Sequence, residues 1–250
     1  MKPEWDYTTL ASFCVKRPPY AAFAIDRMLR AAGLSPGMLV CDIGAGVAHL
    51  TIPLAEFGLD VVALEPNTAM RTYGQERMRS FPNVQWVNGC GESTGQPGLT
   101  FDLVTFGSSF NVVDRTKALK ETARILKRHG WFACLWNHRD LDDPLQKAVE
   151  GVIHRSLPAY DYGVRRQDQS AVIQSSGLFR DVRLIEARVV HTIAIADWLD
   201  AWRSHATLRR QAGDRFEAIL IEIERLLIET RKSSVGVPYT TRIWLAQKIA

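Results

Sequence analysis

Residues 38–50 read MLVCDIGAGVAHL, and this stretch predicts how the chain folds. Its first six residues are mostly apolar without polar alternation, which is typical of a parallel strand buried on both faces. Gly44 and Gly46 then interrupt the run, and residues 49–57 are apolar at helical spacing. We therefore expect a strand, a glycine turn and a helix. Such a turn lets a ligand approach the backbone, and the helix start offers it unpaired N–H groups.

A second apolar run, residues 59–64, ends at Glu65, about 20 residues after the turn. A carboxylate at that position can accept hydrogen bonds from both hydroxyls of a ribose. Glycine in a strand-to-helix turn is a weak signal alone, because it is also used for steric reasons. The glycine turn and the spaced acid together indicate an adenosine-containing ligand. A dinucleotide-binding turn generally carries a third glycine for helix packing, and here that position is His49.

With Asp42 two residues before Gly44, the turn resembles the first motif of class I S-adenosylmethionine-dependent methyltransferases, which typically reads D-x-G-x-G. The resemblance continues along most of the chain. Residues 64–70 (LEPNTAM) resemble the second motif, 84–87 the third strand, 88–92 the loop that closes over adenine, and 101–106 the fourth strand. Residues 118–127 and 131–136 resemble the next helix and the fifth strand. Between them the family's KPGG turn is reduced to residues 127–130 (KRHG), with no proline and one glycine.

The resemblance implies an α/β fold with a Rossmann-like, doubly wound, seven-stranded sheet. The sheet is expected to be mostly parallel with an antiparallel last strand, with helices on both faces and a helical cap. Residues 1–36 would form an N-terminal helical lid segment, 37–137 the cofactor-binding core, 138–180 a helical insert, and 181–250 the C-terminal strands and cap that complete the same single domain. The alternation of residues 182–190 predicts a half-buried strand, and 216–228 an amphipathic helix. Residues 239–247 are expected to pair antiparallel beside the sixth strand, whereas dehydrogenases usually keep the sheet parallel.

The resemblance also implies the cofactor S-adenosyl-L-methionine, which becomes S-adenosyl-L-homocysteine. Residues 17–20 (RPPY) resemble the RPxYP entry of a bacterial subgroup that includes trans-aconitate-methyltransferase-like proteins. By that resemblance Arg17 reaches the cofactor carboxylate, and the alternative is an exposed arginine on a packing helix. The positions expected to bind the cofactor are Arg17, Asp42, Gly44, Ala45, Gly46, Glu65, Pro66, Met70, Cys90, Gly91, Glu92, Gly107, Ser108 and Phe110.

No catalytic residue can be assigned from the sequence, because an activated sulfonium methyl makes a dedicated base optional. Asn111 and His138 follow the fourth and fifth strands, where ligands bind in open parallel sheets. Asn111 is equally explained as a loop-capping amide and His138 as a solvated loop residue. His205 is expected on one helical face with Trp198 and Trp202, in the core or in a cap over the substrate. The catalytic candidates are therefore His138, Asn111 and His205.

Two tyrosines in the insert, Tyr160 and Tyr162, line the substrate pocket or merely pack. Asp114 and the pair Asp142-Asp143 before Pro144 are expected to start helices.

The composition of the 250 residues is that of an ordinary globular protein. The net charge of +4 comes from scattered arginines, Arg165 and Arg166 among them, and no basic run predicts nucleic acid binding. Four cysteines without metal-ligand spacing predict no metal site and a reduced, cytoplasmic protein. The sequence has no recognisable signal peptide and no apolar run long enough to cross a bilayer, so no membrane association is expected.

The function that these expectations favour is in-line SN2 methylation of oxygen or nitrogen on a small molecule, by a monomer or homodimer. One alternative is a non-catalytic protein that binds S-adenosylmethionine or S-adenosylhomocysteine. The other is an NAD(P)-dependent oxidoreductase, which the missing third glycine and the expected last strand disfavour.

Overall fold

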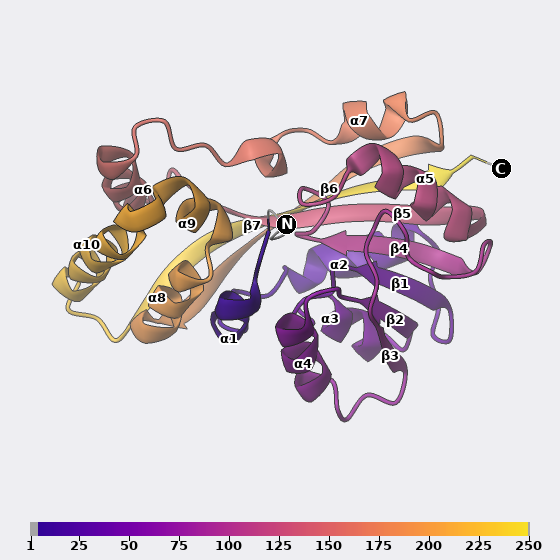
Figure 1. Ribbon diagram of the computed structural model, residues 1–250, viewed down its shortest axis with the longest axis horizontal. Coiled ribbons are helices and arrows are strands. Elements are labelled where there is room, and N and C mark those ends of the chain that lie inside the picture. The colour runs from indigo at the N-terminus through magenta and orange to yellow at the C-terminus, as the bar shows by residue number, and fades with distance from the viewer. Residues whose placement is uncertain (1–4, 250) are drawn as a thin grey trace.

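The computed structural model describes residues 5–249 of the chain. These residues are organised around one mixed sheet (Figure 1). The sheet has seven strands in the order β3-β2-β1-β4-β5-β7-β6. Neighbours from β3 to β5 are parallel, and β7 runs antiparallel to both β5 and β6. The predicted α/β fold with an antiparallel last strand is confirmed. The strands are β1 (Leu39–Ile43), β2 (Asp60–Leu64), β3 (Val84–Val87), β4 (Phe101–Gly107), β5 (Leu126–Arg139), β6 (Phe179–Ala194) and β7 (Ser234–Lys248).

Helices cover both faces of this sheet because the central strands are apolar on both sides. Helices α2 (Ala22–Ala31) and α3 (Thr51–Glu56) pack on one face, and α5 (Arg115–Ile125) and α7 (Ser170–Ser175) pack on the other. Near the N-terminus, η1 (Thr8–Leu10) and α1 (Ala11–Cys14) lie against α4 (Thr68–Arg77). No helix within residues 5–249 has both the length and the apolar character needed to cross a membrane.

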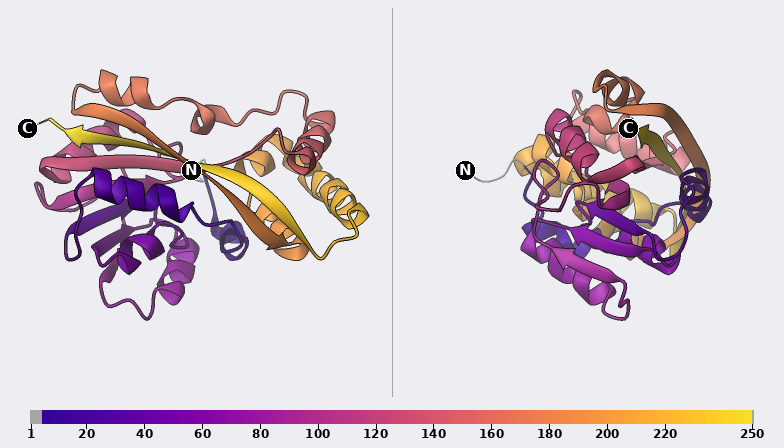
Figure 2. Two further views of the ribbon diagram at one scale, coloured as in Figure 1. Left: turned by 180° about the vertical axis from the view of Figure 1, so that it is seen from behind. Right: turned by 90° about the vertical axis from the view of Figure 1, so that its right-hand side faces the viewer.

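The cap is a separate apolar cluster built on a two-stranded ribbon. Strands β6 and β7 are longer than predicted, and residues 190–194 and 234–238 pair only with each other. Figure 2 shows this ribbon leaving the sheet and running beneath the cap helices. The helical elements of this region are α6 (Pro144–Ser156), η2 (Gly163–Arg166), α8 (Ile195–Arg203), α9 (Ala206–Ala212), η3 (Gly213–Arg215) and α10 (Phe216–Glu229). The division into lid segment, core, insert and cap stays a prediction, and residues 1–4 and 250 of its outer segments lie outside the described residues.

Both predicted N-caps are confirmed. The Asp114 carboxylate accepts the N–H of Lys117 at the start of α5, and the Asp143 carboxylate accepts that of Gln146 at the start of α6. Pro144 occupies the first turn of α6, where its missing N–H leaves no bond unmade.

Other boundaries differ from the expectations. Helix α3 begins only at Thr51, because Ala48 has a φ of 72° and residues 46–50 form turns. The segment 127–130 is a bulge inside β5, since Phe101 pairs with Leu126 but Leu103 pairs with Trp131.

Helix α8 ends at Arg203, so the expected single helical face with Trp198, Trp202 and His205 is wrong. His205 is instead the N-cap of α9, and its ring stacks on Trp202 with centroids 5.2 Å apart.

Phe110 was expected to bind the cofactor, and the structure corrects this. Its side chain is fully buried among aromatic rings, with centroids 5.3 Å from Phe106 and 5.4 Å from Phe132. It belongs to the cluster between the sheet and α5, because an apolar ring in a tight loop gains more from that core than from a polar cavity.

Phe110→Ala is expected to lower the free energy of unfolding by about 3–5 kcal/mol, because it leaves a cavity in a packed aromatic cluster. Urea unfolding followed by circular dichroism measures the change. Val190→Ala, at a position 61% exposed on β6, is the control and should cost far less. If Phe110→Ala lowered the free energy of unfolding no more than Val190→Ala does, the assignment of Phe110 to the core would be contradicted.

Candidate functional site

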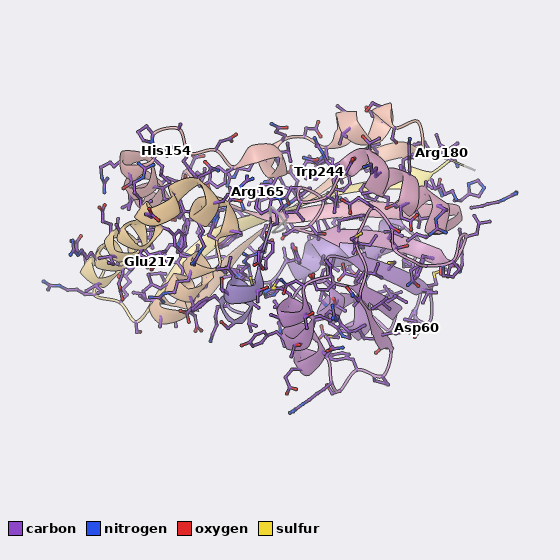
Figure 3. All side chains as sticks on the ribbon, viewed as in Figure 1. Asp60, His154, Arg165, Arg180, Glu217 and Trp244 are labelled. Carbon is purple, nitrogen blue, oxygen red and sulfur yellow. The ribbon has the colours of Figure 1, made fainter. Side chains whose placement is uncertain are left out.

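A cavity of about 470 Å³ opens at the carboxyl ends of the parallel strands. The loops after β1, β2 and β4 form one half of its wall, and the end of β5, η2 and α8 form the other. Figure 3 shows Arg165 at the junction between the sheet and the cap helices. Parallel sheets place their ligands at this edge, so the cavity is the candidate site.

The glycine turn after β1 has fewer free N–H groups than its sequence predicts. The N–H groups of Gly44 and Ala45 both donate to the carbonyl of Leu64, at 2.8 and 3.0 Å. That of Gly46 donates to Glu65 Oε2 at 2.9 Å. The turn therefore holds the ends of β1 and β2 together instead of presenting these three donors to a ligand.

Gly44 has a packing reason to be glycine. Its φ is +69°, and a Cβ there would lie 2.5 Å from the Cβ of Ser109. The Ser109 hydroxyl in turn donates to the carbonyl of Ile43 at 2.5 Å. The absence of a side chain thus lets the loop after β4 pass directly over the turn.

The carboxylate of Glu65 is fixed by backbone donors from two loops. Oε2 accepts the Gly46 N–H, and Oε1 accepts the N–H of Asn67 at 2.8 Å. The side chain is buried and borders the cavity, and burial raises its pKa although the two N–H groups favour the charged form. A carboxylate has about four acceptor positions, so two remain for hydroxyl groups in the cavity.

Asp42, near the end of β1, is held by two threonine side chains instead of backbone N–H groups. Its two oxygens accept hydrogen bonds from the hydroxyls of Thr51 and Thr105, at 2.8 and 2.9 Å. The side chain is completely buried, and desolvation raises the pKa of the carboxyl to about 6. Asp42 therefore links β1 to α3 and β4.

Most positions predicted to bind the cofactor do border the cavity. Gly46 does not border it and contributes only its N–H to Glu65, and Phe110 lies in the core. The predicted positions that do border it are Arg17, Asp42, Gly44, Ala45, Glu65, Pro66, Met70, Cys90, Gly91, Glu92, Gly107 and Ser108.

Residues 14–21 form a wall that connects the core to the cap. The Arg17 guanidinium donates from Nε to Ser204 Oγ at 2.7 Å and from Nη2 to the Ser204 carbonyl. Tyr20 shares a 2.9 Å hydrogen bond with the Ser108 hydroxyl of the core. Asn137 at the end of β5 donates to the carbonyl of Pro19 at 2.7 Å. Arg17 is therefore partly buried against the cap, and the alternative of an exposed arginine is wrong.

The two candidate histidines are neutral at pH 7. His138 lies in β5, not in a solvated loop, and its Nε2 donates to the Arg165 carbonyl at 2.9 Å. Burial, with nearby arginines, lowers its pKa to about 4. His205 is partly buried in the same region, and desolvation beside Arg165 and Arg139 lowers its pKa well below the usual value. Both rings border the cavity as weak bases.

Asn111 also borders the cavity, and its side-chain oxygen accepts the indole N–H of Trp136 at 3.0 Å. It is thus held by a side chain from β5 rather than capping its own loop. Of the two insert tyrosines, Tyr162 borders the cavity whereas Tyr160 packs in the cap core.

Several residues at the site were not predicted from the sequence. Tyr20 and Trp136 line the cavity, as does the cationic group Arg139, Arg165 and Arg166. Arg165 and Arg166 are adjacent in the chain, but nothing in their local pattern distinguishes them from surface arginines. The one feature of the sequence that pointed to a site residue here was the position of residues 137–139 at the end of a central strand, which is where Arg139 lies.

Comparisons with known proteins agree with this fold. Residues 41–134 match the model of a family described as a methyltransferase domain. Over 124 residues the chain is 35% identical to an uncharacterized methyltransferase of Mycobacterium tuberculosis, covering 50% of this chain and 48% of the relative. Over 156 residues it is 31% identical to the ubiquinone/menaquinone biosynthesis C-methyltransferase of an Enterobacter species, covering 60% of each.

Among solved structures, the YcgJ protein of Bacillus subtilis matches with a TM-score of 0.59 at 17% identity, over 92% of this chain and 100% of that one. This likeness concerns the fold. The chain spans about half to three fifths of the length of the two curated relatives.

Asp42→Asn is expected to change how stability depends on pH. The folded pKa of about 6 exceeds the value near 4 of an unfolded aspartate, so the folded state holds a proton that the unfolded state loses between these pH values. Wild-type stability contributed by this group is therefore present below about pH 4 and lost by about pH 6, an effect on the order of 2–3 kcal/mol. Asparagine avoids the loss, since its amide can still bond both threonine hydroxyls.

Urea unfolding at pH 4 and at pH 8 measures the free energy of unfolding of variant and wild type. The difference between them should shift in favour of Asp42→Asn at the higher pH. Asp60→Asn, at an exposed position (Figure 3), controls for the loss of one carboxylate. A difference that is the same at both pH values would contradict the buried ionisation.

Proposed function

We propose that the protein is an S-adenosylmethionine-dependent methyltransferase of class I and that it methylates a small molecule bound in the cavity at the carboxyl edge of its sheet, since residues 41–134 match a methyltransferase domain. The acceptor atom would be oxygen or nitrogen, as the sequence suggested. The Enterobacter relative is named a C-methyltransferase, so carbon acceptors should be tested as well.

The observation that carries the proposal is the oriented carboxylate of Glu65 beside a turn whose donors are already used. Two acceptor positions of Glu65 are left for a vicinal pair of ribose hydroxyls. A pyrophosphate would instead need free N–H groups at the turn. The N–H groups of Gly44, Ala45 and Gly46 are all paired, so the site fits an adenosyl group without phosphates better than a dinucleotide.

The cavity also has a suitable size and enclosure. Its volume of about 470 Å³ is within the roughly 300–1,000 Å³ usual for small-molecule sites. Arg17, which the sequence resemblance assigns to the cofactor carboxylate, borders the cavity and is held by Ser204. Residues 14–21 and the cap helices enclose the cavity, which keeps water from the reacting groups.

When bound, S-adenosylmethionine supplies a sulfonium methyl group that is already activated for displacement. The protein then has to hold the acceptor in line with that methyl group. His138 and His205 are weak bases because burial and neighbouring arginines lower their pKa, so neither is assigned a proton transfer. The reaction proposed here depends on orientation and exclusion of water.

Isothermal calorimetry with S-adenosylmethionine, S-adenosylhomocysteine and NAD tests the cofactor. The first two should bind and NAD should not. Methyl transfer to a panel of oxygen, nitrogen and carbon acceptors then separates an enzyme from a protein that only binds the cofactor. Binding of NAD alone would overturn the proposal.

Glu65→Ala is expected to weaken S-adenosylhomocysteine binding by at least about tenfold, because hydrogen bonds to a charged group contribute about 1.5–3 kcal/mol. Calorimetry measures the affinity, and thermal unfolding without ligand shows whether the turn remains folded. Glu56→Ala, at an exposed position on α3, should leave the affinity unchanged. Unchanged affinity in folded Glu65→Ala would place the ribose elsewhere.

A further inference from the structure

The charges around the cavity are separated into two halves. Its three bordering acids, Asp42, Glu65 and Glu92, lie on or after β1, β2 and β3. Four arginines border it, and three of them, Arg139, Arg165 and Arg166, lie on the cap side at the end of β5 and in η2. The part of the cavity beyond the expected cofactor position is therefore cationic.

Only one of these three arginines has an acidic partner. Arg139 donates through Nη2 to Glu150, a carboxylate that also accepts the Tyr162 hydroxyl. Its Nη1 is buried with no hydrogen-bond partner among the described residues. Arg166 donates to the backbone carbonyl of Arg139 at 2.7 Å. Between residues 5 and 249, neither Arg165 nor Arg166 forms an ion pair with a carboxylate, and Arg139 has the Glu150 carboxylate as its partner.

The Arg165 guanidinium contacts the ring of His205. Its Nη2 lies 3.1 Å from His205 Nε2, while His205 Nδ1 receives the N–H of Leu208 at 3.3 Å. A neutral imidazole has one lone pair in the ring plane and cannot accept from both groups. In the tautomer whose Nδ1 accepts from Leu208 and caps α9, Nε2 carries the proton and the contact between Arg165 and His205 lacks an acceptor. An anion beside these two nitrogens would supply it.

Aromatic rings hold the guanidinium planes in place. The Tyr162 ring lies 5.0 Å from the Arg165 guanidinium carbon and 4.6 Å from that of Arg166, and the Trp202 ring lies 4.3 Å from that of Arg139. Stacking on rings leaves the N–H edges of guanidinium groups available, and those edges match carboxylate and phosphate oxygens in pairs. Burial also lowers the pKa of Arg165 and Arg166, which is the expected sign of cations that lack a counter-ion.

We infer that the molecule methylated at this site is an organic acid whose carboxylate or phosphate group is held by Arg165 and Arg166. Its apolar body would lie along Trp198, Trp202 and Tyr239, which border the same half of the cavity. This inference rests on the proposed function, since it places the acid in the half of the cavity that the cofactor leaves free.

The test uses the full chain saturated with S-adenosylhomocysteine and four probes: phenylacetate, phenyl phosphate, neutral phenylacetamide and inorganic phosphate. Calorimetry should show at least one aromatic anion binding about tenfold or more tighter than phenylacetamide, as expected for charge-assisted hydrogen bonds. The tighter of the two anions identifies the carboxylate or the phosphate as the preferred group. Inorganic phosphate should bind more weakly than phenyl phosphate, because it lacks the apolar body.

Arg165→Gln and Arg166→Gln should each weaken the preferred anion about tenfold while leaving the affinity for S-adenosylhomocysteine within twofold. Arg225→Gln, an exposed position on α10, removes the same charge outside the cavity and should change neither affinity. Arg165→Lys keeps the charge without the paired N–H edge and should recover only part of the binding. If a variant fails to fold, the wild-type comparison of anion and amide still decides the inference.

Equal binding of phenylacetate and phenylacetamide, no binding of either aromatic anion, or displacement of S-adenosylhomocysteine by the anion would overturn the inference. Failure of the proposed function gives a different result. In that case S-adenosylhomocysteine itself does not bind, whereas anion binding that depends on Arg165 persists in the unliganded protein.

Discussion

The insertion of β7 between β5 and β6 is the constraint on which the two-part site depends. Strand β7 is hydrogen-bonded to β5 only as far as the pair Arg139 and Tyr239, and beyond it continues with β6 alone. The resulting ribbon carries the apolar cluster of α6, α8, α9 and α10. Because β7 runs antiparallel to β5, this ribbon extends past the carboxyl ends of the parallel strands. The cap is consequently held over the cofactor half of the cavity.

The same geometry separates the charges of the cavity. Loops after the parallel strands supply Glu65, whose orientation comes from the N–H groups of Gly46 and Asn67. The cap side supplies Arg165 and Arg166, whose guanidinium groups rest on the ring of Tyr162. The fold thus keeps the carboxylate of Glu65 apart from the guanidinium groups of Arg165 and Arg166, so these charges do not pair with each other. A buried charge left unpaired in this way costs free energy, which is why such charges are associated with binding sites.

The parts of the fold that local pattern controls were predicted well. The apolar runs before Gly44 and Glu65 became β1 and β2, and Asp114 and Asp143 start the helices that follow them. Predictions failed where a distant segment decides the outcome. Phe110 belongs to the core because α5 and the rings of β4 and β5 surround it. The donors of the glycine turn are occupied because β2 ends beside them.

The sequence by itself determined the order of strands and helices, the antiparallel last strand and the acid that faces the expected cofactor. The elements and the acid depend on side-chain periodicity or on residues within about 20 positions of one another, which the linear pattern contains. The antiparallel last strand was implied by the resemblance to the methyltransferase family. Only the tertiary structure decided which arginines, histidines and aromatic rings meet across the cavity. Arg165, His205 and Trp202 come from different elements, and their contact requires the β6–β7 ribbon to fold the cap back over the sheet.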